Sequence, residues 1–242
     1  MKVVVPMAGR GSRFSIEGFT TPKPLLDVAG KPMVLRALES INGMDVSEII
    51  FVLLKEHELQ YSISEMLTSQ LSIPSSFVLL DDVTEGQLCT VLEARNKINS
   101  PEDVLVVASD TYVNGSLAND IANGRAKYAG LISVIGMPGN SWSFARTDVN
   151  GEVVEVAEKI RISDHASTGI YYFSNGQQLI HFADAIINAK EKTKGEYYVI
   201  PVYQKMISQG LKVGISQATA MWDMGTPTAK KAYEDFLESI IS

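Results

Sequence analysis

Several features that define common protein classes are scarce or absent in this sequence of 242 residues. Its one cysteine, Cys89, excludes an intramolecular disulfide framework, and its three histidines lack the spacing of a zinc site. No apolar run reaches the roughly 20 residues that a membrane-spanning helix needs. Proline at position 6 breaks the opening apolar run before a signal-peptide core can form, so we expect a cytoplasmic protein.

Positive charge is also in deficit. The 21 Lys and Arg residues face 28 Asp and Glu residues, which gives a formal net charge of -7 and a pI near 5.1. Such a chain has no broad electrostatic footprint for nucleic acid, so we expect neither a nucleic-acid partner nor a membrane partner. Hydrophobic residues make up 45% of the sequence, and the mean hydropathy is +0.07. These values exclude a disordered chain and predict a globular protein with a sizeable core.

Short β-branched runs alternate with segments of helical period. This alternation predicts an α/β protein of Rossmann-like class, with a mixed, mainly parallel central sheet flanked by helices. We expect strands near residues 2–7, 47–54, 77–80, 103–108, 130–136, 143–147, 153–157, 168–173 and 211–216. We expect helices near residues 30–42, 56–70, 87–98, 176–192, 199–209 and 226–241. An Asn-Gly pair at residues 150–151 predicts a hairpin within a small β-rich subregion of the second half.

The domain organisation is predicted to be simple. No linker rich in Pro, Gly or Ser interrupts the chain, so we expect a single domain over residues 1–242. The pattern changes near residue 128, which divides the domain into halves of about 1–128 and about 129–242. Apolar helix faces can form either core or interface, so a homo-oligomer is left open.

A glycine-containing loop at residues 8–13 follows the first expected strand. Its glycines let the backbone turn sharply and present N–H groups to an anion, and Arg13 can clamp phosphate oxygens. Neither standard nucleotide motif is complete. A dinucleotide fingerprint needs glycine where Phe14 stands, and the Gly-Lys-Ser/Thr of a P-loop is absent. An ordinary turn between a strand and a helix is the alternative.

Lys23 lies between Pro22 and Pro24, ten residues beyond Arg13. The two prolines stiffen the chain and therefore fix where the ammonium group points. A lysine held in this way near the loop at residues 8–13 is placed as a point charge for phosphate, whereas a flexible surface lysine is usually solvated.

The loop, the Pro22-Lys23-Pro24-Leu25 segment and Gly30-Lys31-Pro32-Met33 together resemble the sugar-phosphate nucleotidyltransferases, or nucleotide-sugar pyrophosphorylases. The resemblance continues in order along the chain, at Glu85-Gly86, Ser109-Asp110, Glu158-Lys159, Ser167 to Tyr171 and Trp222 to Pro227. It implies a GT-A-like fold in a minimal form without a β-helix domain. The first half would bind the nucleotide and the second half, with its β-rich subregion, the acceptor.

The activity implied by this resemblance is transfer of a nucleotidyl group from a nucleoside triphosphate to a sugar 1-phosphate, with release of pyrophosphate. UTP, dTTP and CTP are the favoured donors, Mg²⁺ is the implied cofactor, and capsule or surface-polysaccharide synthesis is the implied context.

The resemblance also assigns roles to individual residues. Those implied to be catalytic are Arg13, Lys23 and Lys159. Those implied to bind the nucleotide are Ala8, Gly9, Gly11, Ser12, Arg13, Lys23, Gly86, Gln87 and Ser109. Those implied to bind the acceptor are Glu158, Lys159, Thr168 and Gly169. The implied magnesium ligands are Asp110 and Asp223. Ile160 stands where the family commonly has proline, so the local loop and the acceptor are open to difference.

The two aspartates can also be argued from their local sequence. Asp110 lies at the carboxyl end of an expected central strand, where ligands bind in open α/β sheets. The alternative is a helix N-cap, for which Ser116 is better spaced. Asp223 lies between a tryptophan and a methionine, where an unpaired charge is costly unless a cation neutralises it. Its alternative role is a cap or ion pair ahead of the helix expected from residue 226.

Two other functions stay open at this point. A cytidylyltransferase acting on a non-sugar phosphorylated acceptor, such as phosphocholine, would use the same reaction. A catalytically silent nucleotide-binding regulatory module would be expected to lose a charged site residue. The charged residues expected at the phosphates and the metal are all present, namely Arg13, Lys23, Asp110, Lys159 and Asp223. Without the resemblance, Glu158 and Lys159 would be interpreted as a solvated surface pair.

Overall fold

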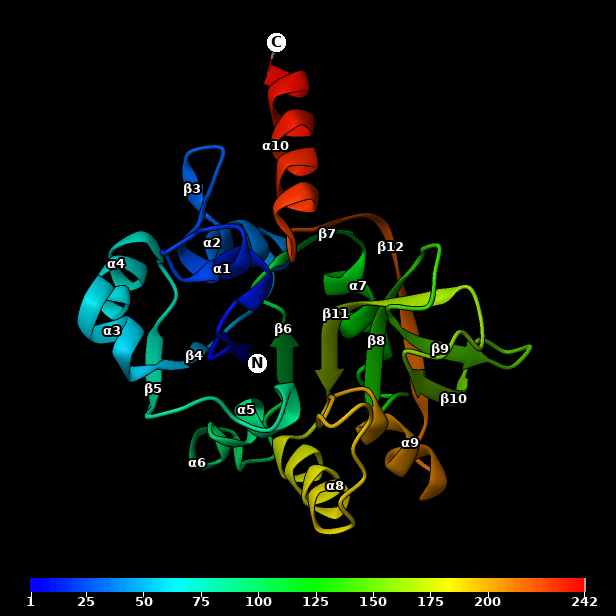
Figure 1. Cartoon of the computed structure of the whole chain (residues 1–242). Coiled ribbons are helices and arrows are strands. Elements are labelled where there is room, and N and C mark those ends of the chain that lie inside the picture. Colours follow the sequence, from blue (N-terminus) through cyan, green and yellow to red (C-terminus); the bar gives the residue numbers. More distant parts are fainter. Residues whose placement is uncertain (242) are drawn as a thin grey trace.

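A mixed sheet of ten strands forms the centre of the protein (Figure 1). The structure, a computed structural model, describes residues 1–241. The ten strands are β1 (Lys2–Pro6), β4 (Glu48–Leu54), β5 (Ser75–Leu80), β6 (Val104–Val107), β7 (Thr111–Gly115), β8 (Gly130–Gly136), β9 (Ser143–Thr147), β10 (Val153–Glu158), β11 (His165–Phe173) and β12 (Val213–Asp223). A separate ribbon joins β2 (Asp27–Val28) to β3 (Lys31–Pro32).

The main path of the sheet runs β5-β4-β1-β6-β11-β8-β12-β7, and the β9–β10 hairpin branches from β11. Parallel pairing joins β5, β4, β1 and β6, and it also joins β8 to β12. Only β11 and β7 run in the opposite direction along this path. The predicted mixed, mainly parallel sheet flanked by helices is therefore confirmed, and most of the carboxyl ends meet at one edge.

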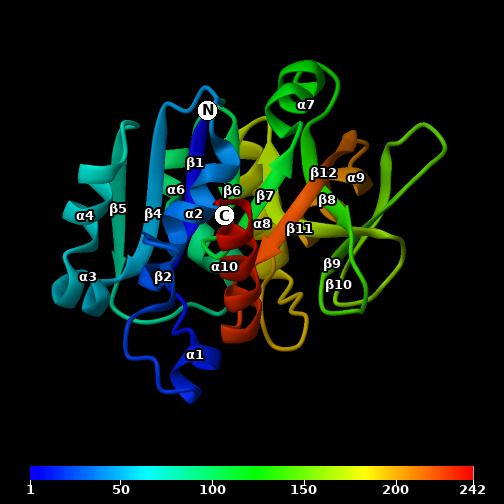
Figure 2. The same ribbon diagram turned by 90° about the horizontal axis from the view of Figure 1, so that it is seen from above.

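Helices cover both faces of the sheet. One face carries α5 (Gln87–Leu92), α6 (Arg95–Ile98), α8 (Gly176–Asn188) and α9 (Pro201–Ser208). The other carries α2 (Met33–Leu38), α4 (Ile63–Gln70) and α7 (Leu117–Gly124), with α3 (Lys55–Tyr61) beside α4. Seen from above, α3, α4 and β5 lie at one end of the sheet and the β9–β10 hairpin at the other (Figure 2).

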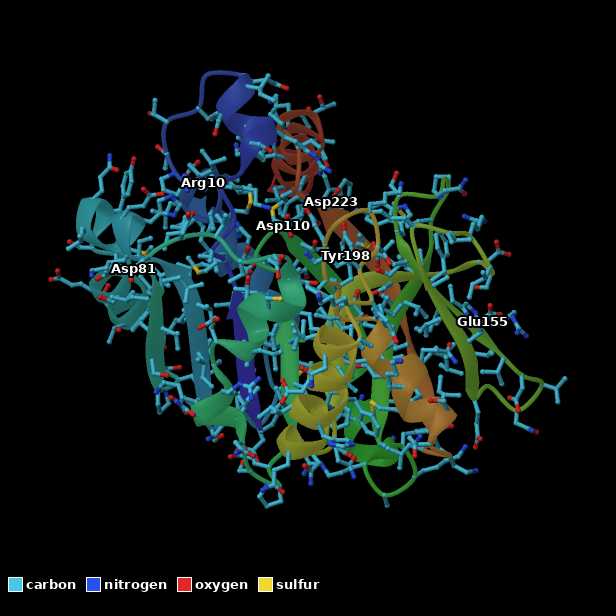
Figure 3. The ribbon with its side chains drawn as sticks, turned by 60° about the horizontal axis from the view of Figure 1, so that its bottom comes forward. Arg10, Asp81, Asp110, Glu155, Tyr198 and Asp223 are labelled. Carbon is cyan, nitrogen blue, oxygen red and sulfur yellow. The ribbon has the colours of Figure 1, made fainter. Side chains whose placement is uncertain are left out.

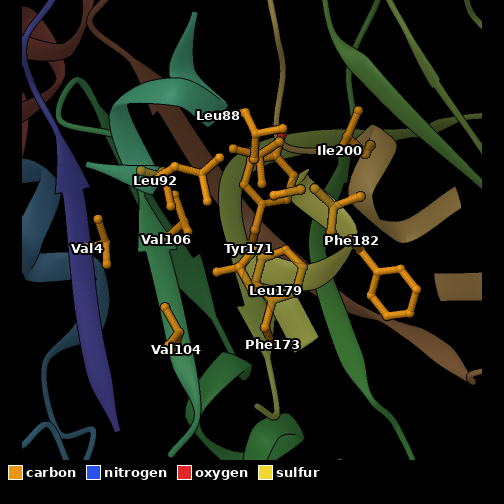
Figure 4. Packing of buried hydrophobic residues seen from close by; sticks show 14 of the residues in the cluster. Val4, Leu88, Leu92, Val104, Val106, Tyr171, Phe173, Leu179, Phe182 and Ile200 are labelled. Atoms are coloured by element: carbon orange, nitrogen blue, oxygen red, sulfur yellow. The ribbon is translucent and has the colours of Figure 1, made fainter. Parts of the chain in front are cut away.

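The core has one hydrophobic cluster on each face of the sheet. Val4 and Val106 point toward α5 and α8, where they join Leu88, Tyr171 and the other side chains shown in Figure 4. Their neighbours in β1 and β6 belong to the opposite cluster, beneath α2 and α7. Because both faces are buried, these strands consist almost entirely of apolar residues.

A third cluster joins the first turns of the chain to its last helix. Phe14 of α1 (Ser12–Ile16) packs with residues of β2 and α2 and with Tyr233 of α10 (Pro227–Ile241). The Trp222 ring stacks on Phe236 of the same helix, with 4.6 Å between ring centroids. The segment after β1 is therefore anchored to the segment after β12.

Several expected elements differ in extent. The expected helix at 56–70 is two helices, because Ser62 adopts a left-handed conformation with φ 48° between α3 and α4. The expected helix at 87–98 divides into α5 and α6, and the expected helix at 30–42 is α2 followed by a 3-10 turn over Glu39–Ile41. The expected strand at 211–216 is the start of β12, which extends to Asp223 and pairs with the unpredicted β7.

The strands at 130–136 and 143–147 match their predicted bounds, and the Asn-Gly turn joins β9 to β10 as predicted. The pairing of β6 with β11 carries one sheet across both predicted halves. Their division into nucleotide and acceptor halves stays a prediction. No helix formed by residues 1–241 is long and apolar enough to cross a membrane.

The closest glycine contact gives a test of this packing. A Cβ on Gly176, at the start of α8, would lie 2.0 Å from the Ile98 carbonyl oxygen, which the backbone holds in place. We expect Gly176→Ala to lower the free energy of unfolding by about 1–3 kcal/mol in urea titrations, as overpacking does. Gly136→Ala is the control, because no heavy atom lies within 4 Å of its added methyl group. Equal stability of the two variants would contradict the packing described.

Candidate active site

Two carboxylates meet where β12 joins β7. Asp110 directly precedes β7, and Asp223 is the last residue of β12, opposite Thr111 in the antiparallel register. The Met224 amide donates a hydrogen bond to the Asp110 carbonyl oxygen at 2.7 Å. A Cβ on Gly225 would lie 2.9 Å from Asp223 Oδ1 and 3.3 Å from Asp110 Oδ2. Both carboxylates therefore border the same small space.

Lys23 neutralises part of this negative charge. Its Nζ lies 2.6 Å from Asp110 Oδ2. Burial opposes ionisation of Asp110, but the charge and hydrogen bond of Lys23 outweigh it and hold the pKa of Asp110 below its usual range. Burial, and then the negative charge of Asp110, raise the pKa of Asp223, against a hydrogen bond from the Gly225 amide. A cation bound between the two carboxylates would relieve this repulsion.

The glycine-containing loop packs against Lys23. Gly11 has a φ of 62°, and a Cβ there would lie 3.0 Å from the Lys23 Cβ. Lys23 itself opens a 3-10 turn over Lys23–Leu25 that begins after Pro22. The structure therefore brings together the two segments that were singled out in the sequence.

Two arginines of this loop are exposed, namely Arg10, which pairs with Asp82, and Arg13. Within residues 1–241 the Arg13 side chain makes no hydrogen bond or ion pair, although its charge acts on Asp223 and on Tyr198. Phe14, which stands where a dinucleotide fingerprint needs glycine, is buried in the third cluster. Of the remaining loop residues, Ala8 is buried, whereas Gly9 and Ser12 are exposed. The arrangement leaves a guanidinium group available to an anion beside the carboxylates.

Glu158 and Lys159 lie at the end of β10. The interpretation as a solvated surface pair is wrong for Glu158, which is 7% exposed and accepts a hydrogen bond from Ser143. Burial raises the pKa of Glu158, against that hydrogen bond. Lys159 adopts a left-handed conformation with φ 56°, and its Nζ donates a hydrogen bond to the Tyr198 hydroxyl. The two neighbouring side chains therefore occupy different environments.

The start of β11 lies beside the end of β6. Gly169 has a φ of 84°, and its carbonyl oxygen accepts a hydrogen bond from the Ala108 amide at 3.1 Å. Thr168 is 1% exposed, and its Oγ1 has no hydrogen-bond partner among residues 1–241. Ser109 is buried between Ala108 and Asp110. The predicted acceptor strand and the first carboxylate are thus close neighbours.

Gly86 is required by packing. Its φ is 138°, and a Cβ there would lie 2.5 Å from the Tyr197 carbonyl oxygen. Gln87 follows as the first residue of α5, and the Leu88 amide donates to the same carbonyl at 3.1 Å. This contact accounts for the glycine, while the predicted roles of Gly86 and Gln87 at the nucleobase stay predictions.

The alternative capping roles of the two aspartates are wrong. Asp110 is followed by a strand and not by a helix. Ser116 does precede α7, but its hydroxyl donates to Asp120 and accepts no bond from the helix backbone. Thr226 caps α10 by accepting a hydrogen bond from the Ala229 amide at 3.1 Å, so Asp223 is not needed there.

Sequence reasoning missed three contributors to the site. Ser143 holds Glu158, Gly225 leaves room for the two carboxylates, and Tyr198 contacts Lys159. Tyr197 and Tyr198 are adjacent in the sequence, and nothing local marks one of them as a lysine partner. Only the contact between the Tyr197 backbone and the Gly86 loop places Tyr198 here.

Figure 3 shows Asp110, Asp223 and Tyr198 close together near the middle of the view, with Glu155 far out on the β9–β10 hairpin. No group of three or more His, Cys, Asp or Glu side chains in the described part of the chain could hold a metal by protein ligands alone. The site contains two carboxylates, a lysine and an arginine. The carboxylates can ligate a metal ion, and the two cations can bind phosphate groups whose oxygens would supply further ligands to that metal.

Comparison with known proteins agrees with this geometry. A family model described as nucleotidyl transferase matches residues 2–239. The chain therefore belongs to the nucleotidyl transferase family, which confirms the resemblance to sugar-phosphate nucleotidyltransferases.

Individual relatives are distant. The bifunctional protein GlmU of Methanococcus aeolicus is 25% identical over 229 residues, which cover 94% of this chain and 52% of that protein. The mannose-1-phosphate guanylyltransferase catalytic subunit beta of Dictyostelium discoideum is 22% identical over 180 residues, covering 72% of this chain and 50% of that protein. The chain thus spans about half the length of the curated relatives it matches.

A nucleoside-diphosphate-sugar pyrophosphorylase from Vibrio cholerae RC9 has the same fold, with a TM-score of 0.84 at 24% identity. The match covers 96% of this chain and 99% of that one.

The Lys23–Asp110 pair predicts a pH-dependent stability. Because the folded pKa of Asp110 is lowered, the pair's contribution is complete above the ordinary aspartate pKa of about 4 and is lost as pH falls below it. We expect Lys23→Met to lower the free energy of unfolding by about 2 kcal/mol at pH 7 and by less at pH 3.5, where loss of the contribution has begun and continues until the pH passes the lowered pKa of Asp110. Urea titrations at both pH values measure this, with Lys231→Met of the exposed Asp235 pair as an unaffected control. A loss of equal size at both pH values would contradict the assignment.

Proposed function

We propose that this chain transfers a nucleotidyl group from a nucleoside triphosphate to a sugar 1-phosphate and releases pyrophosphate. The observation that carries the proposal is the convergence of Asp110 and Asp223 beside Lys23, with Arg13 exposed nearby. Family membership supports the reaction class, and the activities named for the relatives, a mannose-1-phosphate guanylyltransferase among them, support a sugar phosphate as acceptor.

The reaction needs little from the protein beyond positioning and charge. The acceptor phosphate is already an anion, so no general base is required for its attack on the α-phosphorus of the triphosphate. One oxygen–phosphorus bond forms between the two substrates, and the bond to the departing pyrophosphate breaks. Arg13 and Lys23 would hold the triphosphate and stabilise the leaving pyrophosphate, and Lys159 would bind the acceptor phosphate.

Asp110 and Asp223 fit a magnesium ion. Carboxylate oxygens are its preferred ligands, and Mg²⁺ is usually bound by one or two carboxylates together with substrate phosphates and water. Burial, and then the negative charge of Asp110, raise the pKa of Asp223, and a cation at this position would offset both effects. When bound, the ion would neutralise phosphate charge and orient the triphosphate.

The positions of the remaining predicted segments support further contacts with the two substrates. Ala8, Gly9, Gly11 and Ser12 form the loop beside Lys23 and would cradle phosphates with backbone amides, as such loops do. Ser109 would lie along the nucleotide, and Glu158, Thr168 and Gly169 would contact the acceptor sugar. The unpartnered Thr168 Oγ1 supports this role, because a buried hydroxyl without a hydrogen bond is costly unless a ligand supplies one.

Pyrophosphate release with Mg²⁺ tests the reaction. UTP, dTTP, CTP, GTP and ATP are each paired with a panel of sugar 1-phosphates and with phosphocholine. We expect release with one donor and a sugar 1-phosphate, at a rate that Asp110→Asn lowers at least about 100-fold. Asp184→Asn on α8, whose partner is Arg95, is the matched control and keeps the rate.

Each result of the panel has a definite meaning. Release only with phosphocholine would replace the sugar by a non-sugar acceptor, and silence with retained triphosphate binding would favour a regulatory module. A normal rate in Asp110→Asn would remove Asp110 from the reaction.

Lys159 gives a second prediction. Removing its charge weakens the contact with the acceptor phosphate but leaves the triphosphate site intact, so we expect Lys159→Met to raise the KM for the acceptor about tenfold or more. The KM for the nucleoside triphosphate should change less than about twofold. Steady-state kinetics with each substrate varied in turn measure the split, and a rise confined to the triphosphate KM would place Lys159 on the other substrate.

A further inference from the structure

Tyr198 lies in a segment that is held in place by the loop around Gly86. The Tyr197 amide donates to the Glu85 carbonyl oxygen at 2.9 Å, and the Tyr197 carbonyl accepts from the Leu88 amide at 3.1 Å. Gly86 packs so closely on this backbone that even a methyl group would not fit. The residues that follow Tyr198 are buried in the core. The backbone on both sides of Tyr198 is therefore fixed.

The hydroxyl of Tyr198 joins two charged groups. It accepts a hydrogen bond from Lys159 Nζ and donates one to Glu196 Oε2 at 2.7 Å. Lys159 Nζ also lies 4.4 Å from the centroid of the Tyr198 ring. Burial and the hydrogen bond to Glu196 raise the pKa of Tyr198, so the hydroxyl keeps the proton that it donates. Both contacts favour one orientation of the ammonium group.

This orientation matters because a lysine side chain is long. Ordering it costs rotamer entropy, and a free Lys159 would bear this cost each time a phosphate bound. Lys159 is held in advance by a ring that is itself fixed to another part of the chain. The charge of Arg13 also acts on the Tyr198 hydroxyl.

We propose that Tyr198 is a positioning residue, which holds the Lys159 ammonium group toward the acceptor phosphate and ties it to the Gly86 loop on the nucleotide side. The proposal rests on the proposed function in that it names how the acceptor site is built. Tyr198 acts through Lys159 and takes no part in bond making. Because in-line attack tolerates little displacement of the reacting phosphate, the position of this one ammonium group limits acceptor use.

The chain offers a matched control for this pair. Lys127 Nζ donates to the Tyr128 hydroxyl at 2.6 Å and lies 4.5 Å from the ring centroid, the same two contacts as at Lys159. Tyr128 packs against Gly214 near the start of β12, at the end of the strand opposite Asp223. Tyr128→Phe therefore removes an equivalent hydroxyl away from the site.

The first arm of the experiment does not depend on activity. Acetylation rates of Lys159 and Lys127 by an N-hydroxysuccinimide ester are followed by peptide mass spectrometry in the wild type, Tyr198→Phe and Tyr128→Phe proteins. We expect Tyr198→Phe to raise the rate at Lys159 at least threefold and leave Lys127 unchanged, with the reverse pattern in Tyr128→Phe. An unchanged or slower rate at Lys159 overturns the positioning role, whether or not the wild type is active.

The second arm is a double-mutant cycle on the acceptor that supports pyrophosphate release. We expect Tyr198→Phe to raise the KM for the acceptor about five- to tenfold and to change the triphosphate KM less than twofold. In a Lys159→Met background, Tyr198→Phe should raise the KM for the acceptor by less than a further twofold, because the effect of Tyr198 passes through Lys159. A full effect in that background, or an equal rise in both KM values, overturns the proposal in favour of a structural role for Tyr198.

The two arms separate the proposals. An inactive wild type with the expected labelling pattern would overturn the transferase activity but keep the positioning of Lys159.

Discussion

The site depends on one crossing strand. β12 begins as a parallel neighbour of β8 and ends as an antiparallel neighbour of β7, where its last residue, Asp223, stands opposite Thr111. This register sets Asp223 beside Asp110, more than 100 residues earlier in the chain, and a hydrogen bond from the Met224 amide to the Asp110 carbonyl fixes the junction. A slip of one residue would turn the Asp223 side chain to the other face of the strand and remove it from the site.

Two half-buried carboxylates held together repel each other, and the roles of the surrounding residues can be understood from that repulsion. Lys23 compensates Asp110, which leaves Asp223 as the group whose pKa rises. Holding two like charges together lowers the stability of the fold, and a ligand that completes the charge balance would offset this cost. Arg13, without a partner in the described part of the chain, adds the positive charge that a triphosphate would meet next. The strand pairing and the charged side chains thus define the same site, at the junction of β7 and β12.

Much of the fold could be predicted because the core strands are buried on both faces and therefore consist of nearly continuous apolar runs. The Asn-Gly turn likewise fixed the β9–β10 hairpin from local sequence alone. The second half of β12 could not be found in this way, because residues 217–221 are mostly small or polar and form a strand only through pairing with β7. The break at Ser62 was also hidden, since helical periodicity continues through it. Asp110, Lys23 and Arg13 could be predicted because each lies next to or within two residues of a recognisable strand, proline or glycine. The place of Tyr198 depends instead on a tertiary contact with the Gly86 loop.

The central claim is that Asp110 and Asp223 act together on one divalent cation in the presence of nucleotide. Mn²⁺ can replace Mg²⁺ for electron paramagnetic resonance, which counts free and bound ions directly. We predict that the wild type with the donor triphosphate binds one Mn²⁺ ion per chain more tightly than the triphosphate does alone, and that Asp110→Asn and Asp223→Asn each abolish this gain. If either variant keeps the full affinity of the wild type, the two carboxylates do not share a metal and the account of the site is wrong.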